Sequence, residues 1–274
     1  MKQPILATVL LSVLAALPTL ASADYLFSAP PRETPEQAKK YYQPIADFLT
    51  KATGEKFSYD LPISWPTYAK NMKTGAYDLV FDGPHFVSWR IDNIQHTALV
   101  KLPQPHEWRI IARKDDPTVN KIQDLEAKRV CGPASPNFGT LIMLSHFTNP
   151  VREPVHVITK GWKDGYNAML AGRCQATVLP KTNHLQYDPQ GGQTKLIYQQ
   201  DPYPNQAFTA GPRMSPELKE RVRQALLSPA GQQAMAPLRE RYSGGKELVN
   251  ASDTEYAGVD SVLDRAVGFG IFAY

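Results

Sequence analysis

The chain is poor in cysteine and in excess charge, and it has no histidine pair with the spacing of a metal site. Its 274 residues contain 2 cysteines and 6 histidines, and the formal net charge is +4. Scattered histidines without a spacing such as H-E-x-x-H argue against a zinc enzyme. A charge excess this small, spread along the chain, argues against a nucleic-acid partner. We therefore expect no enzyme, no bound metal and no cofactor.

Long apolar runs are confined to the start of the chain. Lys2 precedes an apolar stretch over residues 5–20, and Ala21-Ser22-Ala23 fits the small-residue rule for signal-peptide cleavage. The stretch is short for a membrane span, although an N-terminal anchor is the alternative interpretation. We expect residues 1–23 to be a signal peptide and the mature chain to be a soluble periplasmic protein.

Short apolar runs of strand length alternate with helical patterns along most of the chain, which predicts α/β domains built on doubly wound parallel sheets. The strand-like runs lie at residues 25–28, 56–61, 77–81, 129–131, 155–158 and 175–179. The pattern begins twice, once near the start and again after residue 113. The sequence therefore predicts two α/β domains of similar outline.

Two extended runs, residues 108–113 and 200–209, interrupt this alternation and predict strands that cross between the domains. We expect one lobe to comprise residues 24–105 and 202–274, and a second, inserted lobe to comprise residues 106–201. A hinged body of two lobes places a ligand between them.

Residues 82–85 follow a buried strand and begin a helix, which is where open α/β sheets bind ligands. We expect Asp82, Gly83 and His85 to face the cleft, because the turn presents free backbone amides at the positive end of a helix. Asp82 is alternatively a helix cap and His85 a structural histidine. Tyr68 begins an earlier helix and either lines the cleft or packs in the core.

Several short motifs, in this order, resemble the periplasmic substrate-binding proteins of ABC importers, and specifically the phosphate/phosphite/phosphonate-binding family. The motifs are Ala29-Pro30-Pro31, Tyr42-Gln-Pro-Ile-Ala-Asp-Phe-Leu49, Gly83-Pro84, Gly165-Tyr-Asn-Ala-Met-Leu-Ala-Gly172 and Pro204-Asn205. The resemblance implies two α/β lobes joined by two crossing strands, with the ligand clasped between them. It also implies an ABC permease in the inner membrane as partner, or alternatively a sensor kinase, and we expect a monomer.

The resemblance implies that a turn in the second lobe holds an anion at a helix N-terminus. Ser135, Asn137 and Thr140 are the donors available there. Lys181 follows the strand at residues 175–179, where acidic residues would be expected for a ligand with an amino group, and it is either an anion partner or a solvated charge. We expect a small oxyanion of the phosphate, phosphite or simple phosphonate class.

Cys131 and Cys174 are the only cysteines in the sequence, and both lie on predicted strands of the second lobe. Because an exported protein meets an oxidising compartment, we expect a disulfide between them. The alternative is a sensor module in which Cys131 is a free thiolate that binds a soft ligand, such as arsenite or a metal ion.

Overall fold

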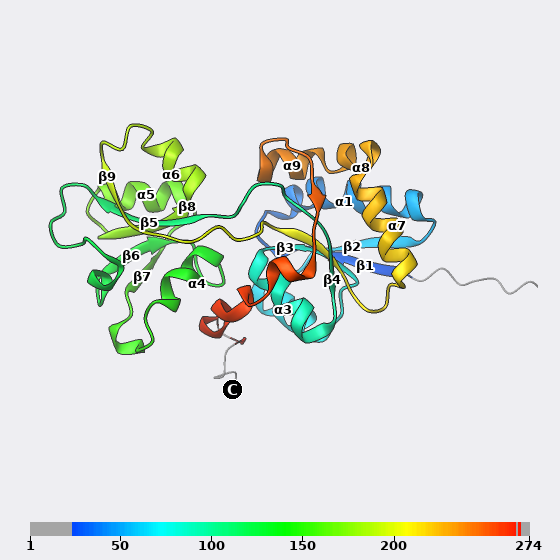
Figure 1. The fold of residues 1–274 in the computed structure, drawn as a ribbon, viewed down its shortest axis with the longest axis horizontal. Coiled ribbons are helices and arrows are strands. Elements are labelled where there is room, and N and C mark those ends of the chain that lie inside the picture. Colours follow the sequence, from blue (N-terminus) through cyan, green and yellow to red (C-terminus); the bar gives the residue numbers. More distant parts are fainter. Residues whose placement is uncertain (1–23, 267, 270–274) are drawn as a thin grey trace, which may run out of the picture.

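A computed structural model describes residues 24–266 and 268–269 of the chain. The predicted signal peptide at residues 1–23 lies outside the described residues. The described part folds into two α/β lobes, each built around one sheet (Figure 1), and the predicted fold class is confirmed. Within that part, no helix is long and apolar enough to cross a membrane.

The first lobe is built on a six-stranded sheet with the strand order β11-β4-β10-β3-β1-β2. Its strands are β1 (Asp24–Ser28), β2 (Lys56–Asp60), β3 (Leu79–Asp82), β4 (Thr97–Lys101), β10 (Ala207–Ala210) and β11 (Val249–Asn250). Strands β2, β1 and β3 are parallel neighbours, whereas β10 runs antiparallel between β3 and β4.

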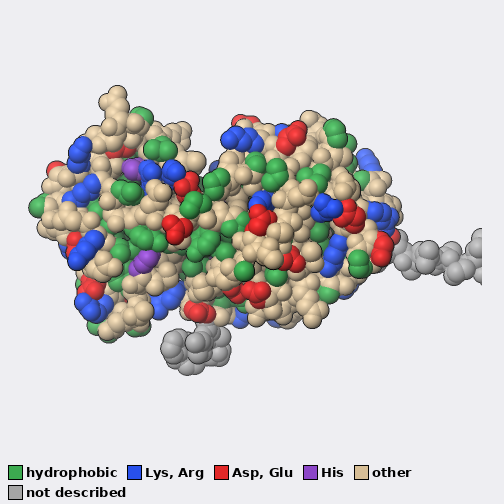
Figure 2. All heavy atoms as spheres, in the orientation of Figure 1, with side chains coloured by type: hydrophobic (Ala, Val, Ile, Leu, Met, Phe, Trp, Pro, Cys, Tyr) green, Lys and Arg blue, Asp and Glu red, His purple; other side chains and the backbone are tan. Residues whose placement is uncertain are grey.

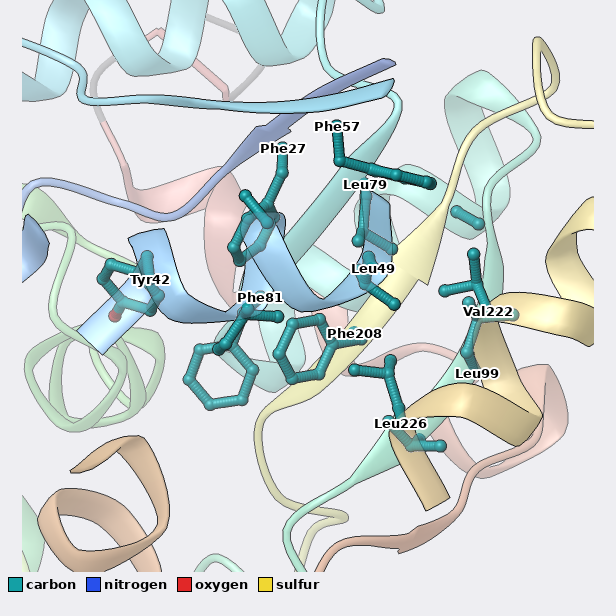
Figure 3. Packing of buried hydrophobic residues seen from close by; sticks show 14 of the residues in the cluster. Phe27, Tyr42, Leu49, Phe57, Leu79, Phe81, Leu99, Phe208, Val222 and Leu226 are labelled. Atoms are coloured by element: carbon teal, nitrogen blue, oxygen red, sulfur yellow. The ribbon is translucent and has the colours of Figure 1, made fainter. Parts of the chain in front are cut away.

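Helices cover both faces of the first sheet. The helices of this lobe are α1 (Pro35–Thr53), α2 (Trp65–Lys73), α3 (Pro84–Ile94), α7 (Pro216–Leu227), α8 (Pro229–Ala234) and α9 (Ala236–Ser243). Side chains alternate along a strand, so Leu79 and Phe81 of β3 pack with α1 and α7 (Figure 3), whereas Val80 packs with α2 on the other face. Asp82 follows the alternation and faces the side of α2 and α3, which matters for the site.

The second lobe is built on a five-stranded sheet with the strand order β7-β6-β8-β5-β9. Its strands are β5 (Trp108–Arg113), β6 (Arg129–Gly132), β7 (Val155–Ile158), β8 (Ala176–Pro180) and β9 (Thr194–Gln199). Its helices are α4 (Phe138–Ser145), α5 (Trp162–Leu170) and α6 (Lys181–Tyr187). Val178 of β8 packs with α4, and Leu179 packs with α5 on the opposite face, so helices cover both faces here too.

Both sheets are mixed, which corrects the expectation of purely parallel sheets. Strand β10 pairs antiparallel with its neighbours in the first lobe, and β5 pairs antiparallel with β8 and β9 in the second. The chain enters and leaves the second lobe through β5 and β9. A strand that returns from the other lobe joins its sheet from the opposite direction, and this produces the antiparallel pairs.

Two connections join the lobes side by side, and they touch at an antiparallel bridge between His106 and Tyr203. Figure 1 shows both connections running from one lobe to the other. The boundaries at residues 105/106 and 201/202 agree with this path and stay a prediction. Figure 2 shows two rounded bodies with an indentation between them.

The end of the described chain lies against both lobes. The 3-10 helices η3 (Asp253–Tyr256) and η4 (Val259–Arg265) precede it, whereas η1 (Ile122–Leu125) and η2 (Pro150–Arg152) belong to the second lobe. Val262 and Leu263 of η4 pack in one apolar cluster with residues of α3 and α4. Arg265 forms an ion pair with Glu153 of the second lobe. Figure 1 shows η4 between α3 and α4.

The predicted disulfide is present. Cys131 of β6 is bonded to Cys174, which lies just before β8, with a Cα–Cα distance of 5.8 Å. Strands β6 and β8 are parallel neighbours, so the two residues meet on one face of the sheet. Both cysteines of the chain form this bond, so neither is a free thiol. The alternative in which Cys131 is a free thiolate for a soft ligand is therefore wrong for this structure.

Candidate functional site

The two predicted turns, one in each lobe, meet where the lobes touch. His85, in the first turn of α3, places its ring against the ring of Phe138, the first residue of α4, with centroids 4.8 Å apart and planes 5° apart. Nε2 of His85 lies 3.3 Å from the carbonyl oxygen of Pro136. One histidine of the first lobe therefore contacts the anion-binding turn predicted in the second lobe.

Behind this turn, Asp82 lies in a buried polar cluster. The hydroxyl of Tyr68 on α2 donates to Oδ2 of Asp82, and Nη2 of Arg90 on α3 donates to the same oxygen at 3.0 Å. Arg90 also donates to the Tyr68 hydroxyl oxygen. Arg90 and Asp82 are both about 1% exposed at the side chain. The cluster joins α2, β3 and α3, so Tyr68 and Asp82 hold the turn from inside.

Asp82 also fixes the backbone of the turn directly. Its Oδ1 accepts a hydrogen bond of 2.6 Å from the amide of Gly83, which is the N-cap of α3. The alternative interpretation of Asp82 as the helix cap is wrong, because the N-cap is Gly83 and no side chain caps α3. Burial raises the pKa of Tyr68 well above its usual value, so the phenol keeps its proton and stays a donor.

His85 and His106 are neutral at physiological pH because they are buried. Burial lowers the pKa of His85 to about 3 and that of His106 to about 4. A neutral His85 that donates from Nε2 to Pro136 leaves Nδ1 as an acceptor, and Nδ1 is buried without a protein partner within the described chain. The contact between the lobes therefore involves no formal charge on histidine.

Some polar groups in the turn of the second lobe already form hydrogen bonds within that turn. The side chain of Asn137 accepts from the amide of Gly139 at 3.1 Å and caps α4. The hydroxyl of Thr140 is buried and donates to the carbonyl oxygen of Pro133 at 2.7 Å. Ser135 is exposed. The structure thus brings Ser135 and Asn137 to the surface of the turn and places Thr140 inside it.

Lys181 lies at the start of α6 and forms an ion pair with Glu107. Its Nζ lies 2.9 and 3.0 Å from the two carboxylate oxygens of Glu107. The backbone amide of Lys181 also donates to the carbonyl oxygen of Glu107. The positive charge of Lys181 is therefore already balanced by a neighbour.

Arg32 is a cation at this site that the sequence reasoning missed. It follows Pro30-Pro31 after β1, is exposed, and donates from Nη1 to Oε1 of Gln206 at 2.6 Å. Its guanidinium lies 5.3 Å from the ring centroid of Tyr242. Arg32 is also close enough for its charge to add to the effect of burial in lowering the pKa of His85. An arginine that shortly follows a strand ending at the cleft was the available signal.

Aromatic rings from both lobes and from the connections gather around Phe138. His106 and Tyr203 of the two connections lie 5.8 and 5.5 Å from its centroid, and Trp108 lies 6.4 Å away. These residues come from separate segments, so no local pattern in the sequence indicates that they meet. In the residues that the structure describes, no group of three histidine, cysteine, aspartate or glutamate side chains could hold a metal ion.

The comparisons with known proteins identify the family. The family model described as "ABC transporter, phosphonate, periplasmic substrate-binding protein" matches residues 27–256. The chain belongs to this family. The resemblance read from the sequence motifs is thereby confirmed, and the family is one of transport binding proteins in the periplasm.

One curated relative is the phosphate-import protein PhnD of Mycolicibacterium smegmatis. It is 23% identical over 271 residues, and the alignment covers 86% of this chain and 84% of the relative. The alignment therefore extends over most of both proteins.

Solved structures show the same fold at low sequence identity. PhnD1 of Prochlorococcus marinus in complex with methylphosphonate has a TM-score of 0.63 at 12% identity, with 88% of this chain and 97% of that chain covered. A Xanthomonas citri protein bound to ATP has a TM-score of 0.67 at 10% identity, with 89% and 99% covered. A binding protein of a phosphonate ABC transporter from Pseudomonas aeruginosa has a TM-score of 0.60 at 12% identity, with 89% and 86% covered.

Proposed function

We propose that this family member captures a small oxyanion of the phosphate, phosphite or simple phosphonate class between its lobes in the periplasm. It then delivers the anion, as a monomer, to an ABC permease in the inner membrane. The observation that carries the proposal is the meeting of the two strand-to-helix turns, where His85 contacts Pro136 and Phe138. Each turn directs the positive end of a helix toward the other lobe.

The relatives support this class of ligand. One is a phosphate-import protein, and a structural neighbour holds methylphosphonate. In the proposal, residues 24–105 and 202–274 form the first wall of the site and residues 106–201 form the second. Binding energy then shifts the equilibrium from open toward closed lobes, which a permease can recognise.

The contacts divide the predicted residues into two groups. We assign direct ligand contact to His85, whose Nδ1 can accept a hydrogen bond from a protonated oxygen of the anion, and to Ser135 and Asn137 at the other turn. Gly83 positions its turn, because its amide donates to Asp82. Arg32 supplies the positive charge, because it is an exposed residue that lies beside the first wall.

The remaining predicted residues position the turns. Tyr68 and Asp82 are bonded to Arg90, Thr140 is bonded to Pro133, and Lys181 is paired with Glu107. These side chains keep the two turns in place while backbone amides and neutral donors bind the anion. Neutral donors depend on geometry more than on charge, and this suits a receptor that must also release its ligand.

Isothermal titration calorimetry with phosphate, phosphite, methylphosphonate and sulfate tests the proposal. We expect at least one of the phosphorus oxyanions to bind, and Arg32→Gln to weaken that binding by about 10-fold or more, as the loss of a charged hydrogen bond implies. Lys51→Gln, which changes an exposed lysine in the last turn of α1, is the matched control. Absence of binding by all four anions would contradict the proposal.

Delivery is tested separately from binding. Uptake of the bound anion by cells that lack this protein should fall, and a plasmid copy should restore it. If binding is present but uptake is unchanged, and a membrane kinase responds to the anion instead, the protein is a sensor module.

A further inference from the structure

Two indole N–H groups of the second lobe are buried without a hydrogen-bond partner among the described residues. They are Nε1 of Trp108 and Nε1 of Trp162. Trp108 is only 3% exposed. An indole nitrogen can only donate, and a buried donor without an acceptor is costly to a folded protein. Such a pair is a feature that requires a physical explanation.

The two indoles lie together at the edge of the second sheet where its helices begin. Their ring centroids are 5.9 Å apart. Trp108 is the first residue of β5 and pairs with Pro180, the last residue of β8. Trp162 is the first residue of α5 and follows the N-cap Gly161. Both therefore occupy the end of the lobe that faces the ligand space in an α/β sheet.

A glycine brings the Trp108 ring against the anion-binding turn. A Cβ atom on Gly139 would lie 2.2 Å from Cε3 and 2.4 Å from Cζ3 of Trp108, so only glycine fits in this first turn of α4. Cε3 and Cζ3 belong to the six-membered ring, on the side away from Nε1. The indole therefore packs edge-on against α4, and its N–H is directed away from the helix backbone.

The surroundings of Trp108 contain neutral or mutually neutralised groups. The His106 ring lies 5.3 Å from the Trp108 ring, and burial keeps this histidine uncharged. Glu107 and Lys181 neutralise each other in an ion pair. In the second lobe, an anion that enters here meets neutral donors, and the two indole N–H groups are donors of this kind, while Arg32 of the first lobe supplies the charge.

We propose that Trp108 is a ligand-binding residue whose indole N–H donates a hydrogen bond to an oxygen of the bound oxyanion, with Trp162 as a second indole donor beside it. The inference rests on the proposed function and adds the residues that recognise the anion in the second lobe. It also explains Gly139, which allows the indole to lie beside the first turn of α4.

The test is to remove each N–H while keeping an aromatic ring. Trp108→Phe and Trp162→Phe are compared with Trp89→Phe, a change on α3 where the ring packs against Phe269. We expect calorimetry with methylphosphonate and phosphate to show binding weakened about 10-fold by Trp108→Phe, weakened in the same direction by Trp162→Phe, and unchanged by Trp89→Phe.

Nuclear magnetic resonance of the wild-type protein gives a second measurement that does not depend on how the variants fold. The chain has 4 tryptophans, so 15N labelling yields four indole N–H signals. We expect the signals of Trp108 and Trp162 to move downfield when the anion is added, while the signal of Trp89 stays in place.

The outcomes separate the two proposals. Wild-type binding together with wild-type affinity in Trp108→Phe and an unmoved Trp108 signal overturns the inference and leaves the proposed function intact. A wild-type protein that binds none of the phosphorus oxyanions overturns the proposed function and this inference with it.

Discussion

His85 contacts the second lobe as a neutral side chain. Burial lowers its pKa to about 3, and the charges of Arg32 and Arg90 act in the same direction. His106, which is also neutral, is the other titratable ring beside it. Between the unfolded pKa of about 6.5 and the folded value, the unfolded chain binds more protons. The stability that depends on a neutral His85 is therefore full above about pH 6.5 and is lost as the pH falls.

Replacing His85 should make the protein less sensitive to acid. Between pH 7 and pH 5, a histidine that cannot be protonated in the folded state costs about 2 kcal/mol of stability. Between pH 7 and pH 5, we therefore expect the free energy of unfolding of His85→Gln to fall by about 2 kcal/mol less than that of the wild type. Urea unfolding of both proteins at the two pH values measures this difference. The other buried histidines are the same in both proteins, so their contributions cancel. An identical pH dependence in both proteins would show that His85 is not neutralised by burial.

At the scale of elements, the buried ion pair of Arg90 and Asp82 connects α3 to β3. Removing one partner leaves the other charge buried and unpaired, which typically costs about 3–5 kcal/mol. We expect Arg90→Met to destabilise the first lobe by this amount, and Arg90→Met combined with Asp82→Asn to recover part of it. Chemical denaturation of the three proteins measures both steps. A cost of less than about 1 kcal/mol for the single change would mean that the pair is exposed to water.

The disulfide acts on the second lobe alone. Cys131 and Cys174 are separated by 43 residues, and the chain-entropy model assigns about 4 kcal/mol to a loop of this size. We expect Cys131→Ala combined with Cys174→Ala to lower stability by roughly 3–4 kcal/mol. Denaturation of the oxidised wild type and of the double variant gives this difference. Equal stability would contradict a structural role for the bond.

Local signals in the sequence predict where helix α1 begins and ends. They do not predict how the strands that arrive from the other lobe are paired. The capping box at Thr34 and Gln37 and the αL glycine at Gly54 are local signals, and they do bound α1. Strand β11 has two residues and β9 returns to the sheet from a loop, so their pairing depends on tertiary contacts. The pattern of so short a strand carries no information about its partner or its direction.

The candidate site divides in the same way. Asp82 ends strand β3, Gly83 and His85 come just after it, and the position of this turn at the meeting of the lobes agrees with that local pattern. Arg32 and the aromatic residues around Phe138 come from separate segments that meet only through the path of the chain between lobes. Sequence spacing could not predict their roles, because whole stretches of a lobe separate these residues along the chain.

At the scale of the whole molecule, two contacts between the described parts of the lobes bear on how the lobes open. His85 stacks on Phe138, and η4 packs against α3 and α4 while Arg265 pairs with Glu153. The first contact lies at the proposed ligand site and the second lies beside it. Opening the lobes must separate the first contact before a ligand can enter, so this contact competes with the ligand for the same surfaces.

Removing the Phe138 ring should therefore favour the open arrangement. We expect ligand-free Phe138→Ala to have a larger radius of gyration than the wild type in small-angle X-ray scattering. Phe147→Ala is the matched control, because Phe147 is also a buried phenylalanine of the second lobe but follows the far end of α4. Both changes remove a buried ring and should cost about 3–5 kcal/mol of stability. An increase in both variants, or in neither, would show that the ring of Phe138 does not hold the lobes together.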